Sequence, residues 1–105
     1  MKRNKYGAIR TTVDGHNFHS KREAMRYGEL KLLERAGRIR TLKLQPRFSL
    51  IVEGVLICTY VADFQYDEAP LWDLVVEDVK GVRTSTYKIK RALLLATQGI
   101  KILET

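Results

Sequence analysis

Two aspartates and a lysine in the middle of the chain have the types and spacing of a metal-dependent hydrolytic site. Asp63 ends one apolar run, and Asp78 and Lys80 lie together in the next run, Leu71 to Lys80. If that run is a strand, its period of two puts Asp78 and Lys80 on one face and Glu77 on the other. If the two runs pair as a hairpin, Asp63 and Asp78 converge at one end of a sheet.

Two carboxylates beside a lysine suit phosphodiester hydrolysis. Mg²⁺ (or Mn²⁺) takes one or two protein carboxylates and fills its other positions with water and substrate phosphate. A lysine there stabilises charge on the attacked phosphate or helps to deprotonate the attacking water. The alternative is an exposed Asp78–Lys80 ion pair worth under about 1 kcal/mol, with Asp63 only ending a strand. The apolar surroundings of Asp78 favour the site, because a buried carboxylate needs a partner or a metal.

The pattern around these residues predicts a mixed α/β fold in which residues 1–105 form one domain. Residues 1–5 are expected to be a flexible basic arm, and residues 6–18 a hairpin that turns at Asp14-Gly15. Apolar spacing and capping residues predict helices over residues 20–36 and 86–98. Strands are expected over residues 39–44, 48–52, 55–66, 71–80 and 100–103. The core, residues 19–105, is expected to match the order α-β-β-β-α-β, with a fourth strand before the second helix, around a mixed central sheet.

Charge and composition narrow the function classes. The net charge is +7, and it divides into +9 over residues 1–50 and −2 over residues 51–105. The basic half favours an anionic partner, with DNA as the first candidate. One cysteine and two histidines are too few for a disulfide framework or a structural zinc site. Because no apolar run is long enough to span a membrane, we expect a cytoplasmic protein without membrane contact. We also expect no small-molecule cofactor.

Four short segments carry a resemblance to a known family. They are Ser20-Lys21-Arg22-Glu23, Gln45-Pro46, Ala62-Asp63-Phe64 and Glu77-Asp78-Val79-Lys80. With the element order, they resemble the PD-(D/E)XK nuclease superfamily and its restriction-endonuclease-like core, over about residues 16–104. They fall in the order seen in the endonuclease subunit of heteromeric transposases, and they are similar to a family of small phage-encoded proteins of unknown function. Ala62 stands where proline is usual.

The resemblance implies a site and an activity. Asp63 would be the metal-bridging carboxylate, Asp78 the second metal ligand, Lys80 the catalytic lysine and Glu23 an additional acidic ligand. The implied activity is that of a Mg²⁺-dependent DNA endonuclease of phage recombination, repair or packaging, acting in the host cytoplasm. Two alternatives stay open: a register shift of one residue would replace Asp78 by Glu77, and Glu23 could instead complete a helix-capping box.

Basic and amide side chains near these segments are candidates for DNA contact. They are Arg22, Arg26, Gln45, Lys88, Lys90 and Arg91. The last three begin the second expected helix, where backbone N–H groups and the positive end of the dipole favour phosphate. The alternatives are a solvated basic face for the cations and a strand end for Gln45.

No helix has the pattern of a reader of base edges, so we expect structure-specific or low-specificity cleavage, with junction resolution as one form. Cutting both strands would need a homodimer or two visits by one site. The alternative function is a non-catalytic DNA-binding accessory protein that retains the nuclease fold.

Overall fold

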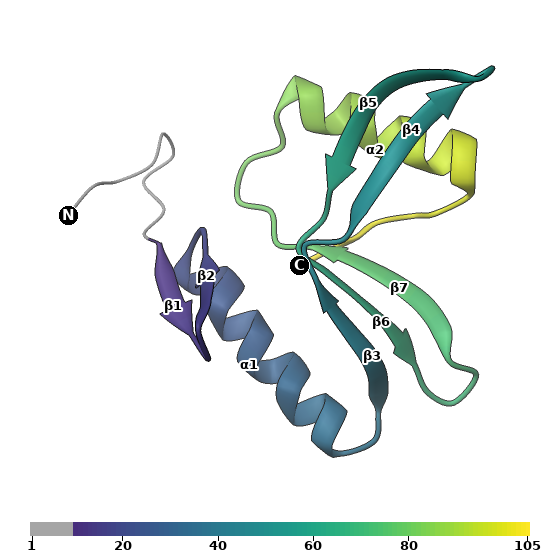
Figure 1. The fold of residues 1–105 in the computed structure, drawn as a ribbon. Helices are drawn as coiled ribbons and strands as arrows, with labels where there is room; N and C mark the ends of the chain where they lie inside the picture. Colours follow the sequence, from purple (N-terminus) through teal and green to yellow (C-terminus); the bar gives the residue numbers. More distant parts are fainter. Residues whose placement is uncertain (1–9) are drawn as a thin grey trace.

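The structure, a computed structural model, describes residues 10–105 and confirms the predicted mixed α/β fold with an N-terminal hairpin (Figure 1). The elements in chain order are β1 (Thr11–Val13), β2 (His16–Phe18), α1 (Lys21–Arg35), β3 (Ile39–Leu44), β4 (Arg47–Val52), β5 (Val55–Val61), β6 (Phe64–Glu68), β7 (Asp73–Asp78), α2 (Ser85–Gln98) and β8 (Leu103–Glu104). The expected arm, residues 1–5, and the first part of the expected hairpin, residues 6–9, lie outside the described residues.

Both helices begin and end within one residue of the positions predicted for them. The hydroxyl of Ser20 accepts a hydrogen bond from the backbone N–H of Glu23 at 3.1 Å, which caps α1. Thr84 caps α2 through the N–H of Tyr87 at the same distance. Gly99 ends α2 with a φ of 68°, a left-handed conformation that glycine adopts without steric cost.

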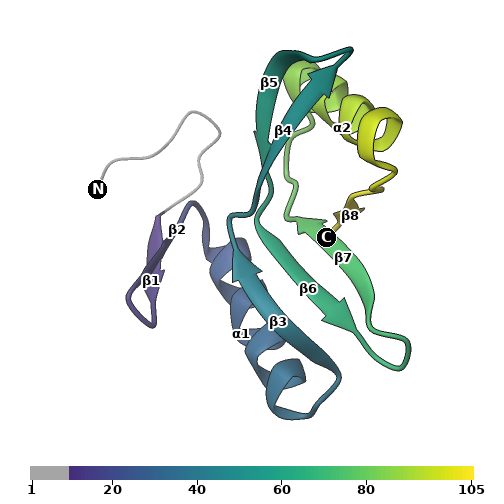
Figure 2. The same ribbon diagram turned by 45° about the vertical axis from the view of Figure 1, so that its right-hand side comes forward.

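The central sheet is mixed and has the strand order β3-β6-β7-β8 (Figure 2). β6 pairs antiparallel with both β3 and β7, and β8 pairs parallel with β7. Phe64, the first residue of β6, lies opposite Glu77, near the end of β7. The predicted pairing of the two apolar runs is therefore confirmed, and Asp63 is brought to the end of β7.

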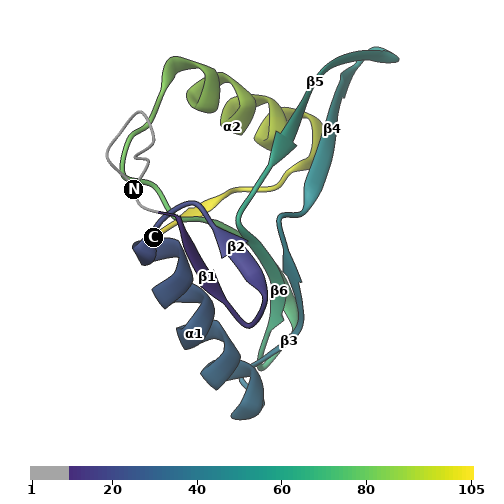
Figure 3. The same ribbon diagram turned by 60° about the vertical axis from the view of Figure 1, so that its left-hand side comes forward.

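The expected strand over residues 55–66 is broken at Ala62-Asp63 into β5 and β6. The neighbouring strand breaks at the same level, because Gln45 adopts a φ of 50° and precedes Pro46. The two breaks are joined by hydrogen bonds from Gln45 N–H to the Asp63 carbonyl at 2.9 Å and from Ala62 N–H to the Pro46 carbonyl at 3.1 Å. β4 and β5 therefore leave the central sheet together as a separate hairpin (Figures 2 and 3). Five strands, β3 to β7, thus lie between the helices, which is more than the expected order α-β-β-β-α-β contains.

Two hydrophobic cores lie on opposite faces of β7. The first core packs α1 against β3 and β6 and includes Tyr27, Leu30 and Phe64. The second core packs α2 against the β4–β5 hairpin and includes Tyr60 and Leu94. β7 contributes Val75 to the first core and Val76 to the second, as the period of a strand requires. No helix within residues 10–105 is long and apolar enough to cross a membrane.

Candidate active site

The break between β5 and β6 fixes Asp63 against the end of β7. The backbone N–H of Asp63 donates to the carbonyl of Glu77 at 3.2 Å. Its carboxylate Oδ2 accepts a hydrogen bond from the N–H of Val79 at 2.7 Å. Main chain and side chain are thus both attached to the residues that flank Asp78, which holds the two aspartates together.

Asp78 is the last residue of β7 and is almost completely buried. The hydroxyl of Tyr60 donates a hydrogen bond to Asp78 Oδ2, and Lys80 Nζ lies 3.3 Å from the same oxygen. Two backbone hydrogen bonds hold the chain beyond the strand. Thr105 N–H donates to the Asp78 carbonyl at 3.0 Å, and Lys80 N–H donates to the Thr105 carbonyl at 3.2 Å. Lys80 therefore stays beside Asp78 although β7 has already ended.

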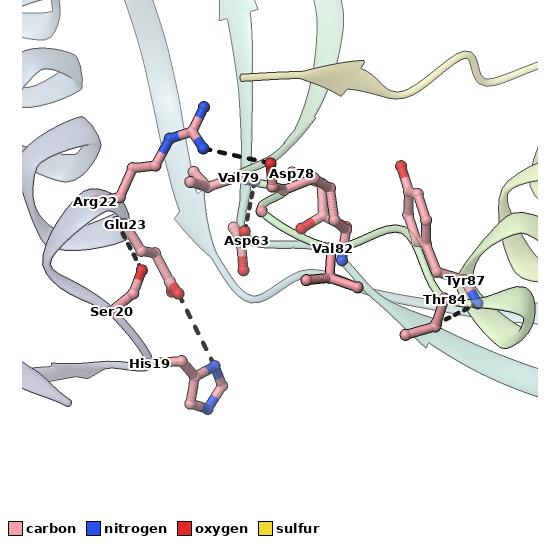
Figure 4. A pocket seen from close by; sticks show the side chains of 12 residues that line it. His19, Ser20, Arg22, Glu23, Asp63, Asp78, Val79, Val82, Thr84 and Tyr87 are labelled. Carbon is pink, nitrogen blue, oxygen red and sulfur yellow. Dashed lines mark hydrogen bonds and ion pairs between the residues drawn. The ribbon is translucent and has the colours of Figure 1, made fainter. Parts of the chain in front are cut away.

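Asp63, Asp78, Lys80 and Glu23 line one pocket of about 410 Å³ between α1 and the start of α2 (Figure 4). The figure shows Glu23 on the α1 side, Asp63 in the middle and Tyr87 on the α2 side. The predicted convergence of Asp63 and Asp78 is realised here. Glu23 comes from the first turn of α1, more than 35 residues before Asp63 in the chain.

Three carboxylates, those of Glu23, Asp63 and Asp78, lie close together in this pocket and raise one another's cost of ionisation. Burial, a hydrogen bond to Asp78 and the charges of Asp78 and Glu23 raise the pKa of Asp63 from 3.8 to about 8. Burial is also the main cause that raises the pKa of Glu23, although His19 opposes it. The pocket therefore disfavours further negative charge and favours a cation.

Glu23 has the signature of a ligand as well as a place in the helix cap. Its side chain is 5% exposed, and Oε1 has no hydrogen-bond partner within the described residues. Its other oxygen, Oε2, lies 3.9 Å from Nδ1 of the exposed His19. A buried carboxylate oxygen without a partner costs free energy unless something binds it. Ser20 provides the cap by accepting the N–H of Glu23, and Oε1 of Glu23 is left over for a ligand.

The donor set fits a hard divalent cation that keeps part of its water shell. Among residues 10–105, no three His, Cys, Asp or Glu side chains are already gathered into a metal-binding group. Mg²⁺ does not require such a group, because one or two carboxylates with water and phosphate complete its octahedron. Asp63 and Asp78 supply the pair of carboxylates, and the unpartnered oxygen of Glu23 is the third candidate.

Glu77 lies on the opposite face of β7 and is completely buried in a closed set of contacts. Arg26 donates to both its oxygens, through Nε to Oε1 and through Nη2 to Oε2 at 3.3 Å, and the Tyr66 hydroxyl donates to Oε2 at 2.8 Å. The register places Asp78, and not Glu77, at the pocket, as the assumed strand phase requires. Glu77 and Arg26 instead join β7 to α1.

The predicted DNA-contact residues fall into several environments. Arg22 lines the pocket, and its Nη1 donates to the Lys80 carbonyl at 3.4 Å. Arg26 is engaged with Glu77, and Gln45 is exposed but lies outside this pocket. The structure therefore brings only Arg22 of these three to the carboxylates, and DNA contact by any of them stays a prediction.

The basic residues of α2 also differ from one another. Lys90 Nζ donates to the Thr59 carbonyl at 2.9 Å, which joins α2 to β5. Arg91 Nη1 donates to Glu104 Oε2 at 2.9 Å, while Lys88 is exposed to solvent. Lys88 is the member of the set whose side chain is most open to an external phosphate.

Two tyrosines that contact the site were not among the sequence candidates. Tyr60 reaches Asp78 from β5, and the ring of Tyr87 from α2 lies 4.1 Å from Lys80 Nζ. Their apolar rings are explained by the second core, so composition alone gave no reason to assign them to the site. Two features of the sequence could have indicated them: Tyr60 lies on the inward-facing side of β5, and Tyr87 lies in the first turn of α2, close to Lys80 in the chain.

Comparison with known proteins assigns a family to this fold and pocket without an activity. Residues 3–99 match the family described as "Protein of unknown function (DUF1064)". No curated protein and no solved structure matches the chain. None of these findings links it to the PD-(D/E)XK nucleases, so that resemblance stays a prediction, and the activity is argued from the pocket.

Proposed function

We propose that the chain, which belongs to the DUF1064 family, is a Mg²⁺- or Mn²⁺-dependent DNA endonuclease of the PD-(D/E)XK type. The observation that carries the proposal is the shared pocket of Asp63, Asp78 and Lys80. Glu77, their neighbour in sequence, faces away from it and is already paired. The pocket differs, because three carboxylates share it with Lys80 and Arg22, and Oε1 of Glu23 has no partner among the described residues.

Each side chain has a role that its position supports. Asp63 and Asp78 would hold the cation, with Glu23 as a third ligand. The bound cation would lower the pKa of a coordinated water and offset charge on the phosphate oxygens. Lys80, held beside the carboxylates, would stabilise the charge that develops on the attacked phosphate or orient the water.

The substrate class is suggested by the charge distribution around the pocket. Arg22 lies at its wall, and the chain as a whole carries a net charge of +7. Contacts of this kind hold the phosphate backbone and do not read bases, so we expect structure-specific or low-specificity cleavage of DNA.

Cleavage of end-labelled DNA tests the proposal. Four-way junction, flap, linear duplex and single strand would each be incubated with Mg²⁺, Mn²⁺ or EDTA. We expect metal-dependent cutting that falls by about 1000-fold in Asp78→Asn and in Lys80→Ala, because each removes a charge at the reacting phosphate. The matched control is Asp73→Asn, the same substitution at an exposed position of the same strand.

The same assay separates the proposed nuclease from its alternative. Wild-type protein that binds all four DNAs but cuts none with either metal would contradict the endonuclease. It would favour a DNA-binding accessory protein that retains the fold. Equal cutting of junction and linear duplex would exclude a dedicated junction resolvase.

A further inference from the structure

Two tyrosines from different elements meet behind the pocket. Tyr60 comes from β5 and Tyr87 from the first turn of α2, and their ring centroids lie 6.2 Å apart. Both belong to the second core and are at least nine-tenths buried. Each directs one interaction toward a different functional group, Asp78 or Lys80.

Tyr60 acts on the carboxylate. Its hydroxyl donates to Oδ2 of Asp78, the oxygen that Lys80 Nζ also approaches. Two donors on one oxygen restrict rotation of the carboxylate about its Cβ–Cγ bond.

Tyr87 acts on the lysine. Its ring lies 4.1 Å from Lys80 Nζ, within the range of a cation–π contact. The ring itself is fixed, because its hydroxyl donates to Glu104 Oε2 at 2.6 Å. Arg83 and Arg91 hold Glu104 in turn, at 3.0 and 2.9 Å. Lys80 is thereby held between the carboxylate of Asp78 and the face of Tyr87.

We propose that Tyr60 and Tyr87 are positioning residues of the site, Tyr60 for the metal-binding carboxylate of Asp78 and Tyr87 for the ammonium group of Lys80. This inference rests on the proposed function and adds a division of labour to it. Tyr60 governs how tightly the cation is held, and Tyr87 governs the rate once the cation is bound. Partners of metal ligands commonly change metal affinity by about 10- to 100-fold when they are removed.

Calorimetric titration with Mn²⁺ tests the role of Tyr60 without any cleavage assay. Tyr60→Phe removes only the hydroxyl and is expected to weaken Mn²⁺ binding by about 10-fold. The matched control is Tyr66→Phe, which removes an equally buried hydroxyl from Glu77, the preceding residue of the same strand. We expect its Mn²⁺ affinity to equal that of the wild type. Equal affinities in all three proteins, or equal losses in both variants, would overturn the role of Tyr60.

A pair of variants at one position tests the role of Tyr87. Tyr87→Phe keeps a ring near Lys80, and Tyr87→Leu removes it. At saturating Mn²⁺ we expect kcat to fall by about 10-fold in Tyr87→Leu with KM for DNA unchanged. The fall should be smaller in Tyr87→Phe, which keeps the ring near Lys80 but loses the hydroxyl that fixes it. The ring-current shift of the Lys80 Cε protons, measured by NMR, should follow the same order. Loss of kcat without loss of that shift would contradict the positioning role.

The two readouts also distinguish failure of this inference from failure of the proposed function. A wild-type protein that binds Mn²⁺ but cuts no DNA would contradict the endonuclease, while the calorimetric and NMR comparisons would still decide the tyrosines. A wild-type protein that cuts DNA with unchanged values in Tyr60→Phe and Tyr87→Leu would leave the endonuclease standing and overturn the positioning roles.

Discussion

Glu77 and Asp78 are neighbours in β7 and equally buried, yet the two faces of the strand treat their carboxylates differently. On the α1 face, Glu77 receives hydrogen bonds from the guanidinium of Arg26 and the hydroxyl of Tyr66. One negative charge meets one positive charge, and both carboxylate oxygens are bonded. Because both oxygens of Glu77 are already hydrogen-bonded and its charge is neutralised, this carboxylate is not available to a ligand.

On the pocket face the charges do not balance. Asp78 shares its surroundings with Asp63 and Glu23, and Lys80 is the cation in contact with it. The raised pKa of Asp63 and the unpartnered oxygen of Glu23 are two consequences of that imbalance. The comparison teaches that burial of charge alone does not identify a functional carboxylate, whereas incomplete pairing of a buried charge does.

The largest expected effect comes from breaking the closed pair. Glu77→Gln removes the negative charge opposite Arg26 and should lower the free energy of unfolding by about 3 kcal/mol. Urea denaturation followed by circular dichroism measures this loss, and Asp73→Asn at the exposed start of β7 is the control. Cleavage per folded molecule should be retained. A loss of stability no larger than that of the control would contradict the assignment of Glu77 as a structural group.

On the pocket face, we expect that removing a carboxylate raises the free energy of unfolding instead of lowering it. Asp63 has a pKa of about 8 in the folded chain and 3.8 as its ordinary value. Between these two pH values the folded chain holds a proton that the unfolded chain has lost, so stability falls as pH rises from about 4 to 8. Asp63→Asn removes this loss and should raise the free energy of unfolding at pH 8 by on the order of 1 kcal/mol, after allowance for solvent screening.

Thermal unfolding at pH 5 and pH 8 measures this difference. The gain of Asp63→Asn over the wild type should be larger at pH 8. Added Mn²⁺ should raise the Tm of the wild type more than that of the variant, because the variant lacks one of the carboxylates that would hold the cation. A variant that is less stable than the wild type at both pH values would refute the idea of a strained pocket carboxylate.

The smallest expected effect on stability is that of Glu23→Gln, and it distinguishes a metal ligand from a helix-capping residue. Glu23→Gln keeps the shape of the side chain, and we expect a change in stability within a few tenths of a kcal/mol together with a several-fold weaker Mn²⁺ affinity. Ser20→Ala removes the cap and should cost about 1 kcal/mol without altering Mn²⁺ binding. Calorimetry and urea denaturation of both variants give the comparison. If Glu23→Gln costs as much stability as Ser20→Ala and binds Mn²⁺ normally, Glu23 is a capping residue only.

Local patterns were sufficient for both helices, for most of the strands and for part of the site. The spacing of Ala24, Tyr27 and Leu30 predicted α1, and the period of two in β7 predicted that Asp78 and Glu77 face opposite ways. These features depend on residues close in the chain, where propensity and periodicity apply. The same locality explains why Ser20 was identified as part of a cap.

Contacts between distant segments could not be read from those patterns. Arg26 and Glu77 are 51 positions apart, and no local rule indicates that this arginine is used inside the protein and not at its surface. The break at Asp63 depends on a matching bend at Gln45 in the neighbouring strand. Tyr60 has the sequence context of a core residue, and only its contact with Asp78, 18 positions further along the chain, reveals the use of its hydroxyl.

The β4–β5 hairpin offers a place to modify the protein without disturbing its site. Its tip, Glu53-Gly54, is a solvent-exposed turn with positive φ at both residues. The other end of the hairpin is where β5 leads into β6 (Figure 3), and Asp63, which lines the pocket, lies between these two strands. Exposed turns are the positions at which inserted sequence is best tolerated. A peptide tag or a fluorophore grafted between Glu53 and Gly54 would report on tumbling and on binding while leaving both termini and the pocket untouched.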